Sequence, residues 1–341
     1  MPNTVNYPQI IPFISKGKMD AIKNTFGNTL TDRECYGIYI WSQKASAAIY
    51  PLLQQLEVTL RNSIDKEATK VMGLNWWDGV YTDKTKAKWD DFIFNINKGR
   101  DRYKKNYKKN NPSVLSSLIV VPHDDAIAHT DFYTWQAVLS DAFHTQNRKH
   151  VNKSLWPRLT YKVLKGLDRK KTEKAARLDF INELNEIRNY RNRLSHNDCI
   201  WIKMNSNNLQ SAVETVREKI NKIEDLIKTI NPQIHSTLVK WGVFYHARRI
   251  CSQREVEHHM GKNIVNCTNP TMSSILATIY SWTDDGKLTS VVNDGKKTTL
   301  RYISSRRRKR PDMLSMSSLF QVFCQYHLTA ERGLYSIINN A

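Results

Sequence analysis

The residue types needed to cleave RNA without a metal ion occur together in one short stretch, Glu186–His196. Arg188, Arg191 and Arg193 supply permanent planar cations, and a guanidinium binds a phosphate through two parallel hydrogen bonds. His196 ends the stretch, and an imidazole accepts and returns a proton near neutral pH. Phosphate binding and proton transfer are together sufficient for RNA cleavage, so we predict a ribonuclease site here.

An amphipathic helix leads into this stretch and must position it. Apolar residues recur there at every third position and predict a buried stripe; they are Leu178, Ile181, Leu184 and Ile187. We expect the helix to end near Asn197-Asp198. The structural alternative for His196 is a helix C-cap that interacts with the helix dipole.

Two further long helices are expected, one before this helix and one after it. The first follows from apolar residues at three- and four-residue intervals across residues 36–64. The second spans residues 209–230 and stops at Asn231-Pro232. Asp131–Leu139 is apolar and aromatic at helical spacing, and we interpret it as part of the core.

Glu57 and Arg61 lie one turn apart on the first of these helices and allow two interpretations. They can form a surface ion pair, which stabilises a helix by about 0.3 kcal/mol. They can instead lie beside the Glu186–His196 stretch and hold its reacting side chains in position without reacting themselves. Glu186 can do the same from within the stretch. The one-turn spacing by itself favours the surface pair.

The composition indicates a nucleic-acid partner. The 341 residues include 52 Lys and Arg against 32 Asp and Glu, a formal net charge of +20, and such an excess attracts phosphate backbones. An apolar fraction of 40% excludes wholesale disorder, and the lack of a long apolar run excludes a membrane-spanning helix. Five scattered cysteines without a CxxC pair indicate a reducing, cytoplasmic environment.

Basic residues cluster in three segments that we predict to contact RNA. The first also contains tyrosines whose rings can stack on bases, although a solvated helix face is an equal alternative there. The predicted contacts are Lys98, Arg100, Arg102, Tyr103, Lys104, Lys105, Lys108 and Lys109 in the first segment, Lys165, Arg169, Lys170 and Lys171 in the second, and Arg306, Arg307, Arg308, Lys309 and Arg310 in the third.

We expect two domains, residues 1–232 and 233–341, because Gly, Ser and Thr become common after the boundary. In the second domain Ser273–Trp282 has a helical pattern, and Asp294-Gly295 separates two β-favouring runs, which predicts a hairpin. The expected fold class is therefore mainly α, with a small α+β C-terminal appendage that resembles a winged helix.

No cofactor and no metal site are expected. His123, Asp124, Asp125, His129 and Asp131 are metal-ligating types, but their spacing fits no standard site. Asp124 or Asp125, shortly after Pro122, is instead a natural helix cap.

Several blocks of the sequence resemble a known family. Arg191–His196 resembles the R-x4-6-H motif of HEPN-domain ribonucleases, and residues 187–201 look like the signature block of bacterial abortive-infection (Abi) proteins of the AbiD/AbiF type. Further resembling blocks, in the same order, are Leu56–Asn62, Asp131–Leu139 and Leu155–Pro157. The resemblance spans roughly residues 36–230.

This resemblance implies an all-helical HEPN-like domain, often a homodimer, that acts in antiphage defence. It implies a structured noncoding RNA as partner, which restrains the protein as an antitoxin does, guides it or activates it. The implied reaction is metal-independent: a 2′-hydroxyl attacks its own phosphodiester and leaves a 2′,3′-cyclic phosphate. His196 is expected to move the proton, Arg191 to hold the charge of the phosphorane, and Asn192 to orient the histidine or the phosphate.

Helix geometry adds a constraint on this pair. Five residues rotate by about 140°, so Arg191 and His196 do not share one face of a straight helix. Arg188, Asn192 and His196, at four-residue steps, do lie close to one face. Either the helix ends before His196, or Arg191 reaches round it, or the pair forms between subunits.

Asp198, two residues after His196, differs from the residue that one group of HEPN proteins has at this position. HEPN toxins that are silenced by nucleotide transfer have a tyrosine at this place, so we do not expect that control here. Two other functions stay open on the sequence alone. One is a catalytically silent RNA-binding module, and the other is a DNA-binding regulator that uses the C-terminal hairpin and residues 306–310.

Overall fold

A computed structural model describes residues 5–78, 87–145 and 154–262, except the side chains of residues 87–90, and the backbone of three strands between residues 279 and 299. The contacts divide the chain into two units, Met1–Val265 and Asn266–Ala341. The two units are described separately.

The first unit is helical in the part of the chain that the structure describes, as expected. Its α-helices are α1 (Tyr7–Ile10), α2 (Lys16–Phe26), α3 (Asp32–Met72), α4 (Ala87–Asn110), α5 (His123–Ala128), α6 (Phe132–Val138), α7 (Thr160–Val163), α8 (Glu173–Ser195), α9 (Leu209–Ile230), α10 (Pro232–Lys240), α11 (Val243–Ile250) and α12 (Gln253–His259). Short 3-10 turns span Ile11–Phe13, Ser116–Leu118, Asp141–Phe143 and Lys203–Asn205.

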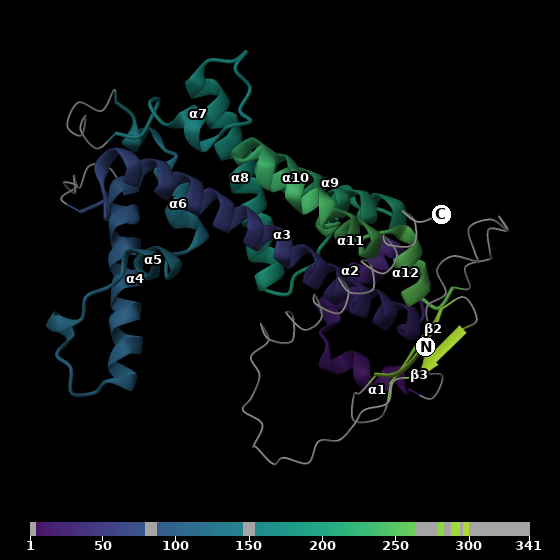
Figure 1. Ribbon diagram of the computed structural model, residues 1–341. Coiled ribbons are helices and arrows are strands. Elements are labelled where there is room, and N and C mark those ends of the chain that lie inside the picture. Colours follow the sequence, from purple (N-terminus) through teal and green to yellow (C-terminus); the bar gives the residue numbers. More distant parts are fainter. Residues whose placement is uncertain are drawn as a thin grey trace. The chain divides into compact units, whose positions relative to one another are not determined.

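Helix α3 is the longest element and the one that most others contact (Figure 1). It begins at a capping box, in which the Thr31 hydroxyl accepts from the Glu34 amide at 3.3 Å and the Glu34 carboxylate accepts from the Thr31 amide at 2.9 Å. It ends at Gly73, whose φ of 85° a residue with a Cβ rarely adopts. The helix expected over residues 36–64 is confirmed and extends further at both ends.

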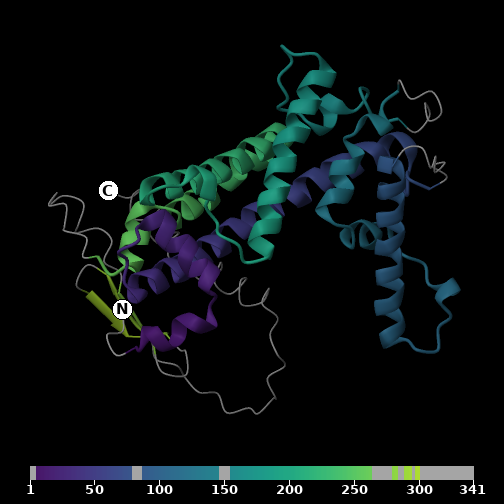
Figure 2. The ribbon, with the colours of Figure 1, turned by 180° about the vertical axis from the view of Figure 1, so that it is seen from behind.

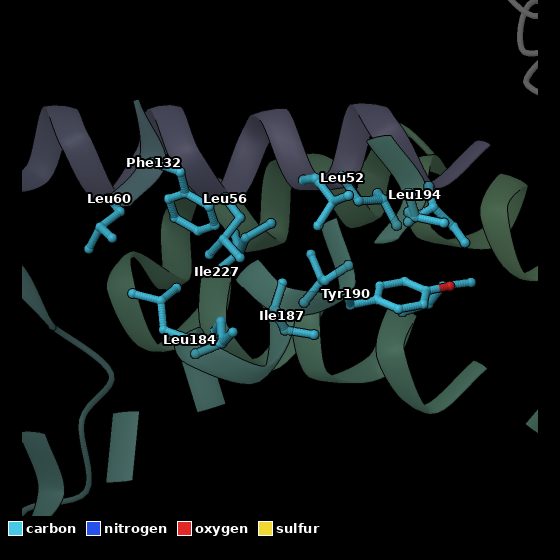
Figure 3. Close-up of a cluster of buried hydrophobic side chains, with 14 of the residues drawn as sticks. Leu52, Leu56, Leu60, Phe132, Leu184, Ile187, Tyr190, Leu194 and Ile227 are labelled. Atoms are coloured by element: carbon cyan, nitrogen blue, oxygen red, sulfur yellow. The ribbon is translucent and has the colours of Figure 1, made fainter. Parts of the chain in front are cut away.

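The core of the first unit forms where α8 and α9 pack against α3, as the view from behind also shows (Figure 2). In Figure 3, Leu52, Leu56 and Leu60 of α3 face apolar side chains of α8 and Ile227 of α9. All of these are almost completely buried. Each buried Leu or Ile side chain stabilises the fold by about 1.5–3 kcal/mol, so this seam accounts for much of the stability.

The stripe expected on α8 is partly wrong. Leu178 is 52% exposed and Ile181 lies only at the edge of the core, whereas Leu184 and Ile187 are buried. The reason is the helical period: nine residues turn by about 900°, which places Leu178 opposite Ile187. The true stripe begins at Ala176 and Arg177 and continues at steps of three and four residues through Phe180, Leu184, Ile187, Tyr190 and Leu194.

Helix α9 confirms its prediction from Leu209 to Ile230. Asn208 caps its start by accepting from the Ser211 amide at 2.8 Å, and Asn231 ends it. Asn231 then caps α10 through the amides of Gln233 and Ile234. One asparagine therefore separates two helices at the predicted break.

The segment expected to be aromatic core, Asp131–Leu139, is also confirmed. Asp131 caps α6 by accepting from the Thr134 amide at 2.9 Å, and Phe132 and Trp135 are buried. The ring of Trp135 packs edge-on against Phe92 of α4. Helices α4, α5 and α6 thereby form a subgroup near the end of α3 (Figure 1).

The first unit continues past the expected boundary at residue 232. Helices α10, α11 and α12 pack on α9 and α3, and the division falls after Val265 instead. The indole of Trp41 on α3 donates to the Ile250 carbonyl at 2.9 Å. Helices α10–α12 therefore belong to the same core as α3, although glycine, serine and threonine become more frequent after residue 232.

The second unit contains strands β1 (Ile279–Trp282), β2 (Leu288–Asn293) and β3 (Lys296–Thr299). They form an antiparallel sheet in the order β1-β2-β3, with Asn293 opposite Lys296 across the expected turn. The helix expected over Ser273–Trp282 is wrong in its last four residues, which form β1 and pair with β2. Residues 306–310 lie outside the described residues, and the winged-helix character stays a prediction.

The corrected stripe of α8 gives a matched test of stability. Leu184→Ala should lower the free energy of unfolding by about 2–5 kcal/mol, because it removes fully buried atoms and leaves a cavity. Leu178→Ala, on the same helix but half exposed, should change it by less than about 0.5 kcal/mol. Urea unfolding followed by circular dichroism measures both, and equal losses would contradict the register described here.

Candidate functional site

The candidate site lies at the C-terminal end of α8, and the helix stops just before its histidine. Ser195 is the last helical residue, His196 is the C-cap, and Asn197 adopts a φ of 53°. The His196 amide donates to the Asn192 carbonyl at 3.1 Å, and the Asp198 amide donates to the Arg193 carbonyl at 3.0 Å. Of the three geometries left open by the sequence, the structure shows the helix ending before His196.

Arg193 holds this end of the helix in place. Its guanidinium pairs with Asp198 at 3.1 Å and donates to the carbonyls of Cys199 and Trp201 at 2.8 and 3.0 Å. Burial alone would raise the pKa of Asp198, but hydrogen bonds from the Cys199 amide and Arg193 outweigh it and lower the pKa. Arg193 therefore fixes the turn and is not available to a phosphate.

Asn192 and His196 face solvent. Both side chains are exposed, and within the described residues neither makes a hydrogen bond or an ion pair. An exposed imidazole beside an exposed amide is accessible to a substrate or to a second copy of the chain. The structure does not join the His196 and Arg191 side chains by a hydrogen bond within the described protomer.

Arg188 and Arg191 lie closer to the core than these two residues. The guanidinium of Arg188 stacks on the ring of Tyr133 of α6, 4.8 Å from its centre, and its buried Nε has no hydrogen-bond partner among the described residues. Arg191 is half-buried. Two partly buried cations on adjacent turns of α8 form a positive edge next to the exposed amide and imidazole.

Glu57 of α3 lies close enough to this edge for the charges to interact. Burial raises the pKa of its carboxyl; Arg191 and then Arg61 lower it, and Asp131 raises it further, with a net rise. The expected surface ion pair between Glu57 and Arg61 is absent from the described residues, and Arg61 donates instead to Asn62 at 3.2 Å. Glu57 therefore interacts electrostatically with Arg191 of α8 as well as with Arg61 of its own helix.

Glu186 lies elsewhere. It accepts hydrogen bonds from Lys219 and Lys222 of α9, and these outweigh the effect of burial and lower its pKa. The structure therefore uses Glu186 to join α8 to α9 and does not bring it to Arg191.

Sequence reasoning missed a tyrosine in this region. The hydroxyl of Tyr50 donates to the Ser195 hydroxyl at 3.2 Å, and Ser195 donates to the Arg191 carbonyl at 2.9 Å. Tyr50 and Glu57 are seven residues apart on α3 and so share one face of it. The seven-residue spacing could have indicated that both residues face the same neighbour. It identifies that neighbour only once α8 is known to pack against this face of α3.

The first basic segment forms the outer part of α4, and its members differ in role. Arg100 pairs with Asp78 at 2.8 Å and Arg102 donates to the His129 carbonyl at 3.1 Å, so both are structural. The ring of Tyr103 stacks on Tyr107 at 6.2 Å. Lys104 is partly buried, whereas Lys98, Lys105, Lys108 and Lys109 are exposed and have no carboxylate partner among the described residues.

The second basic segment lies in the loop before α8. Lys165 is exposed, Arg169 lies over the Tyr161 ring at 5.1 Å, and Lys171 pairs with Asp179 at 2.6 Å. The Lys170 amide donates to Asp168 and its side chain is exposed. The third segment, residues 306–310, lies outside the described residues.

The described residues contain neither a cluster suited to a metal ion nor a helix suited to a membrane. No group of three His, Cys, Asp or Glu residues there lies close enough to hold a metal ion. His123 instead hydrogen-bonds Asp65 at 3.0 Å and stacks on Trp77. In the same part of the chain, no helix has the length and apolar character needed to cross a membrane.

Comparison with known proteins gives one match. The profile of a family described as Abi-like protein matches residues 3–202, which is 200 of the 341 residues. The match includes α3, α6 and α8 with Glu57, Arg188, Arg191, Asn192 and His196, and it ends before α9. No curated protein and no solved structure matches the chain.

The raised pKa of Glu57 gives a pH prediction. The folded state disfavours the ionised carboxylate, so wild-type stability should fall as pH rises from the ordinary glutamate pKa through the raised one. Glu57→Gln removes this fall, and the variant should be more stable than wild type at about pH 7 but not at about pH 4. Urea unfolding at the two pH values measures it.

Glu218→Gln is the matched control, because Glu218 is exposed on α9. This variant should show the same change in the free energy of unfolding between the two pH values as wild type does. If Glu57→Gln loses stability at neutral pH, then Arg191 and Arg61 stabilise the Glu57 carboxylate more than burial disfavours it, and the prediction is wrong.

Proposed function

The chain belongs to the Abi-like protein family, and we propose that it is an antiphage abortive-infection protein that acts as a metal-independent endoribonuclease. Family membership indicates the role in abortive infection; the ribonuclease activity is our inference. The observation that supports it best is the end of α8. There an exposed imidazole and amide lie next to two half-buried arginines, and Glu57 of α3 interacts electrostatically with one of them, Arg191.

The proposed reaction needs only groups that this chain supplies. His196 accepts the proton of a substrate 2′-hydroxyl, and that oxygen forms a bond to the neighbouring phosphorus. The bond from phosphorus to the 5′-oxygen breaks, and the imidazolium returns the proton to the leaving oxygen. The products are a 2′,3′-cyclic phosphate and a 5′-hydroxyl.

The arginines have the electrostatic role in this proposal. The pentacovalent intermediate has more negative charge than the diester, and a preorganised cation stabilises that extra charge. Arg191 is the first candidate, and Arg188 is the second because its stacking on Tyr133 holds the guanidinium fixed. Glu57 would then orient Arg191 from α3 without touching the substrate, and Arg61 would interact with the same carboxylate.

A homodimer is part of the proposal. Asn192 and His196 are exposed and have no partner in the described protomer, so a second copy has access to both. A two-fold axis beside this face would bring two copies of the motif together. The Arg191–His196 pair, which no hydrogen bond joins within the described protomer, can then form between chains.

RNA binding is proposed to use the exposed lysines of α4, the loop before α8 and residues 306–310. The net charge of +20 supports a polyanionic partner. We propose a structured noncoding RNA as that partner, with cellular or phage RNA as substrate. The bound RNA restrains, guides or activates the enzyme.

One observation favours the alternative of a catalytically silent RNA-binding module. No group within the described residues hydrogen-bonds the His196 ring, so nothing there fixes its tautomer. In that case the same arginines bind phosphate without reaction.

His196→Ala separates the two functions. Under the proposal it should reduce RNA cleavage by about 10²–10⁴-fold, the usual contribution of a general acid–base group, while RNA affinity changes little. Arg191→Ala should also abolish the cyclic-phosphate ends. The measurement is sequencing of 3′ ends with and without cyclic-phosphate removal, on RNA incubated with each purified protein.

His258→Ala is the control, because His258 is exposed on α12 and away from the motif in sequence. It should cleave as wild type does. If wild type and His196→Ala bind RNA equally and neither yields cyclic-phosphate ends, the ribonuclease proposal is wrong and the silent module is favoured.

The lysines of α4 can be tested by salt dependence. Replacing Lys105, Lys108 and Lys109 with Gln should reduce the slope of log affinity against log salt by about 2, if each lysine neutralises one phosphate of single-stranded RNA. Three other exposed lysines, Lys228, Lys240 and Lys262, give a charge-matched control triple. Equal effects of both triples would show that only net charge matters and that α4 is not a specific RNA-binding face.

A further inference from the structure

An open pocket of about 380 Å³ lies beside the end of α8. Its walls come from α2, from the N-terminal half of α3 and from the turn that follows α8. None of the four proposed reacting residues is among the residues that line it, but Ser195 and Asn197, on either side of His196, are. The pocket is therefore a separate feature that adjoins the proposed site.

The pocket combines flat apolar surface with unpaired hydrogen-bonding groups. Tyr39 and Tyr50 supply rings from α3, and Ile22 and Trp201 add buried apolar walls. Among the described residues that line it, Lys18 is the cation and Asp198 the anion. One cation and one carboxylate give the lining no net charge, so it suits a neutral ligand better than a phosphate.

Several polar side chains that line the pocket have donors or acceptors without a partner among the described residues. Gln43 donates one N–H to the Tyr39 hydroxyl at 2.8 Å, which leaves its other N–H and its carbonyl oxygen without a partner in the described residues. The side chains of Asn197 and Ser46 also make no hydrogen bond there. Donors and acceptors side by side suit a flat ligand whose edge has both.

The pocket also has a fixed shape on the side of α8. Tyr50 donates to Ser195, Ser195 donates to the Arg191 carbonyl, and Arg193 fixes the turn that contains Asn197. A ligand in the pocket thus touches the same turn that presents His196. Binding there would set the position of whatever is attached to that ligand.

We infer that this pocket binds the base of a nucleotide next to the cleaved phosphate and gives the enzyme a base preference. The inference rests on the proposed function. A nucleobase is flat, stacks on tyrosine rings and has donors and acceptors along one edge. With its base held against the turn at Asn197, the attached phosphate lies near the exposed face of α8. Lys18, over the Tyr39 ring at 5.7 Å, meets the backbone at the mouth of the pocket.

The test is binding, so it does not depend on catalysis. The full-length His196→Ala protein is titrated by calorimetry with short RNA oligonucleotides that differ in one base, and with the four nucleoside monophosphates. We expect the oligonucleotide with the preferred base to bind about tenfold more tightly than the one with the least preferred base. Tyr39→Leu and Gln43→Leu should each remove most of that preference.

Gln54→Leu is the matched control, since Gln54 is exposed on α3 outside the pocket. It should keep the preference of the parent protein. Equal affinity for all four bases, or variants that leave the preference intact, would overturn the inference. Monophosphates that bind as tightly as the oligonucleotides would assign the pocket to free nucleotides and would also overturn it.

The outcomes separate this inference from the ribonuclease proposal. If the wild type gives no cyclic-phosphate ends but the base preference depends on Gln43, the pocket stands and the catalytic proposal fails. If cleavage depends on His196 but occurs equally after all four bases and Gln43→Leu changes nothing, catalysis stands and the pocket inference fails.

Discussion

The clamp that Arg193 forms at the end of α8 is the interaction on which the candidate site depends. Its guanidinium binds the carbonyls of Cys199 and Trp201 and the carboxylate of Asp198, and so the helix ends at Ser195. Had the helix continued, His196 would lie about 140° from Arg191 on a regular surface. Because it ends there, the imidazole belongs to a turn, and the same turn forms one wall of the neighbouring pocket.

Partly buried charged groups lie along the C-terminal half of α8, next to the apolar seam. Leu184 and Ile187 pack in a dry core, whereas Arg188 leaves a buried Nε without a partner and burial raises the pKa of Glu57. Partly buried charges cost free energy that apolar residues would not. Partly buried ionisable groups are enriched at binding and catalytic sites, which agrees with the site proposed at the end of α8.

The sequence predicted what depends on local pattern and missed what depends on long-range contact. The helices around Leu56 and over Leu209–Ile230 follow from periodicity and capping, and both are present. Leu178 was misplaced because a three-residue repeat drifts round a helix with a period of 3.6. Glu186 and Glu57 were not distinguished, since only packing shows that one faces the lysines of α9 and the other the arginines of α8.

The family match ends at residue 202, whereas the folded unit continues to Val265. The helices between these two positions are needed to complete the core. The match ends at residue 202, but α9 begins at Leu209 and buries residues such as Val216, Ile220 and Ile223 against α3 and α8. Without α9, the face of α3 that contains Leu52 and Leu56 would be open to water at a cost of about 25 cal/mol for each Å² exposed. The matched region thus contains the site residues, whereas the helices beyond it complete the core that holds α3 and α8 together. Helix α9 therefore helps to hold α8, and with it His196, in place, although it contributes no residue to the proposed reaction.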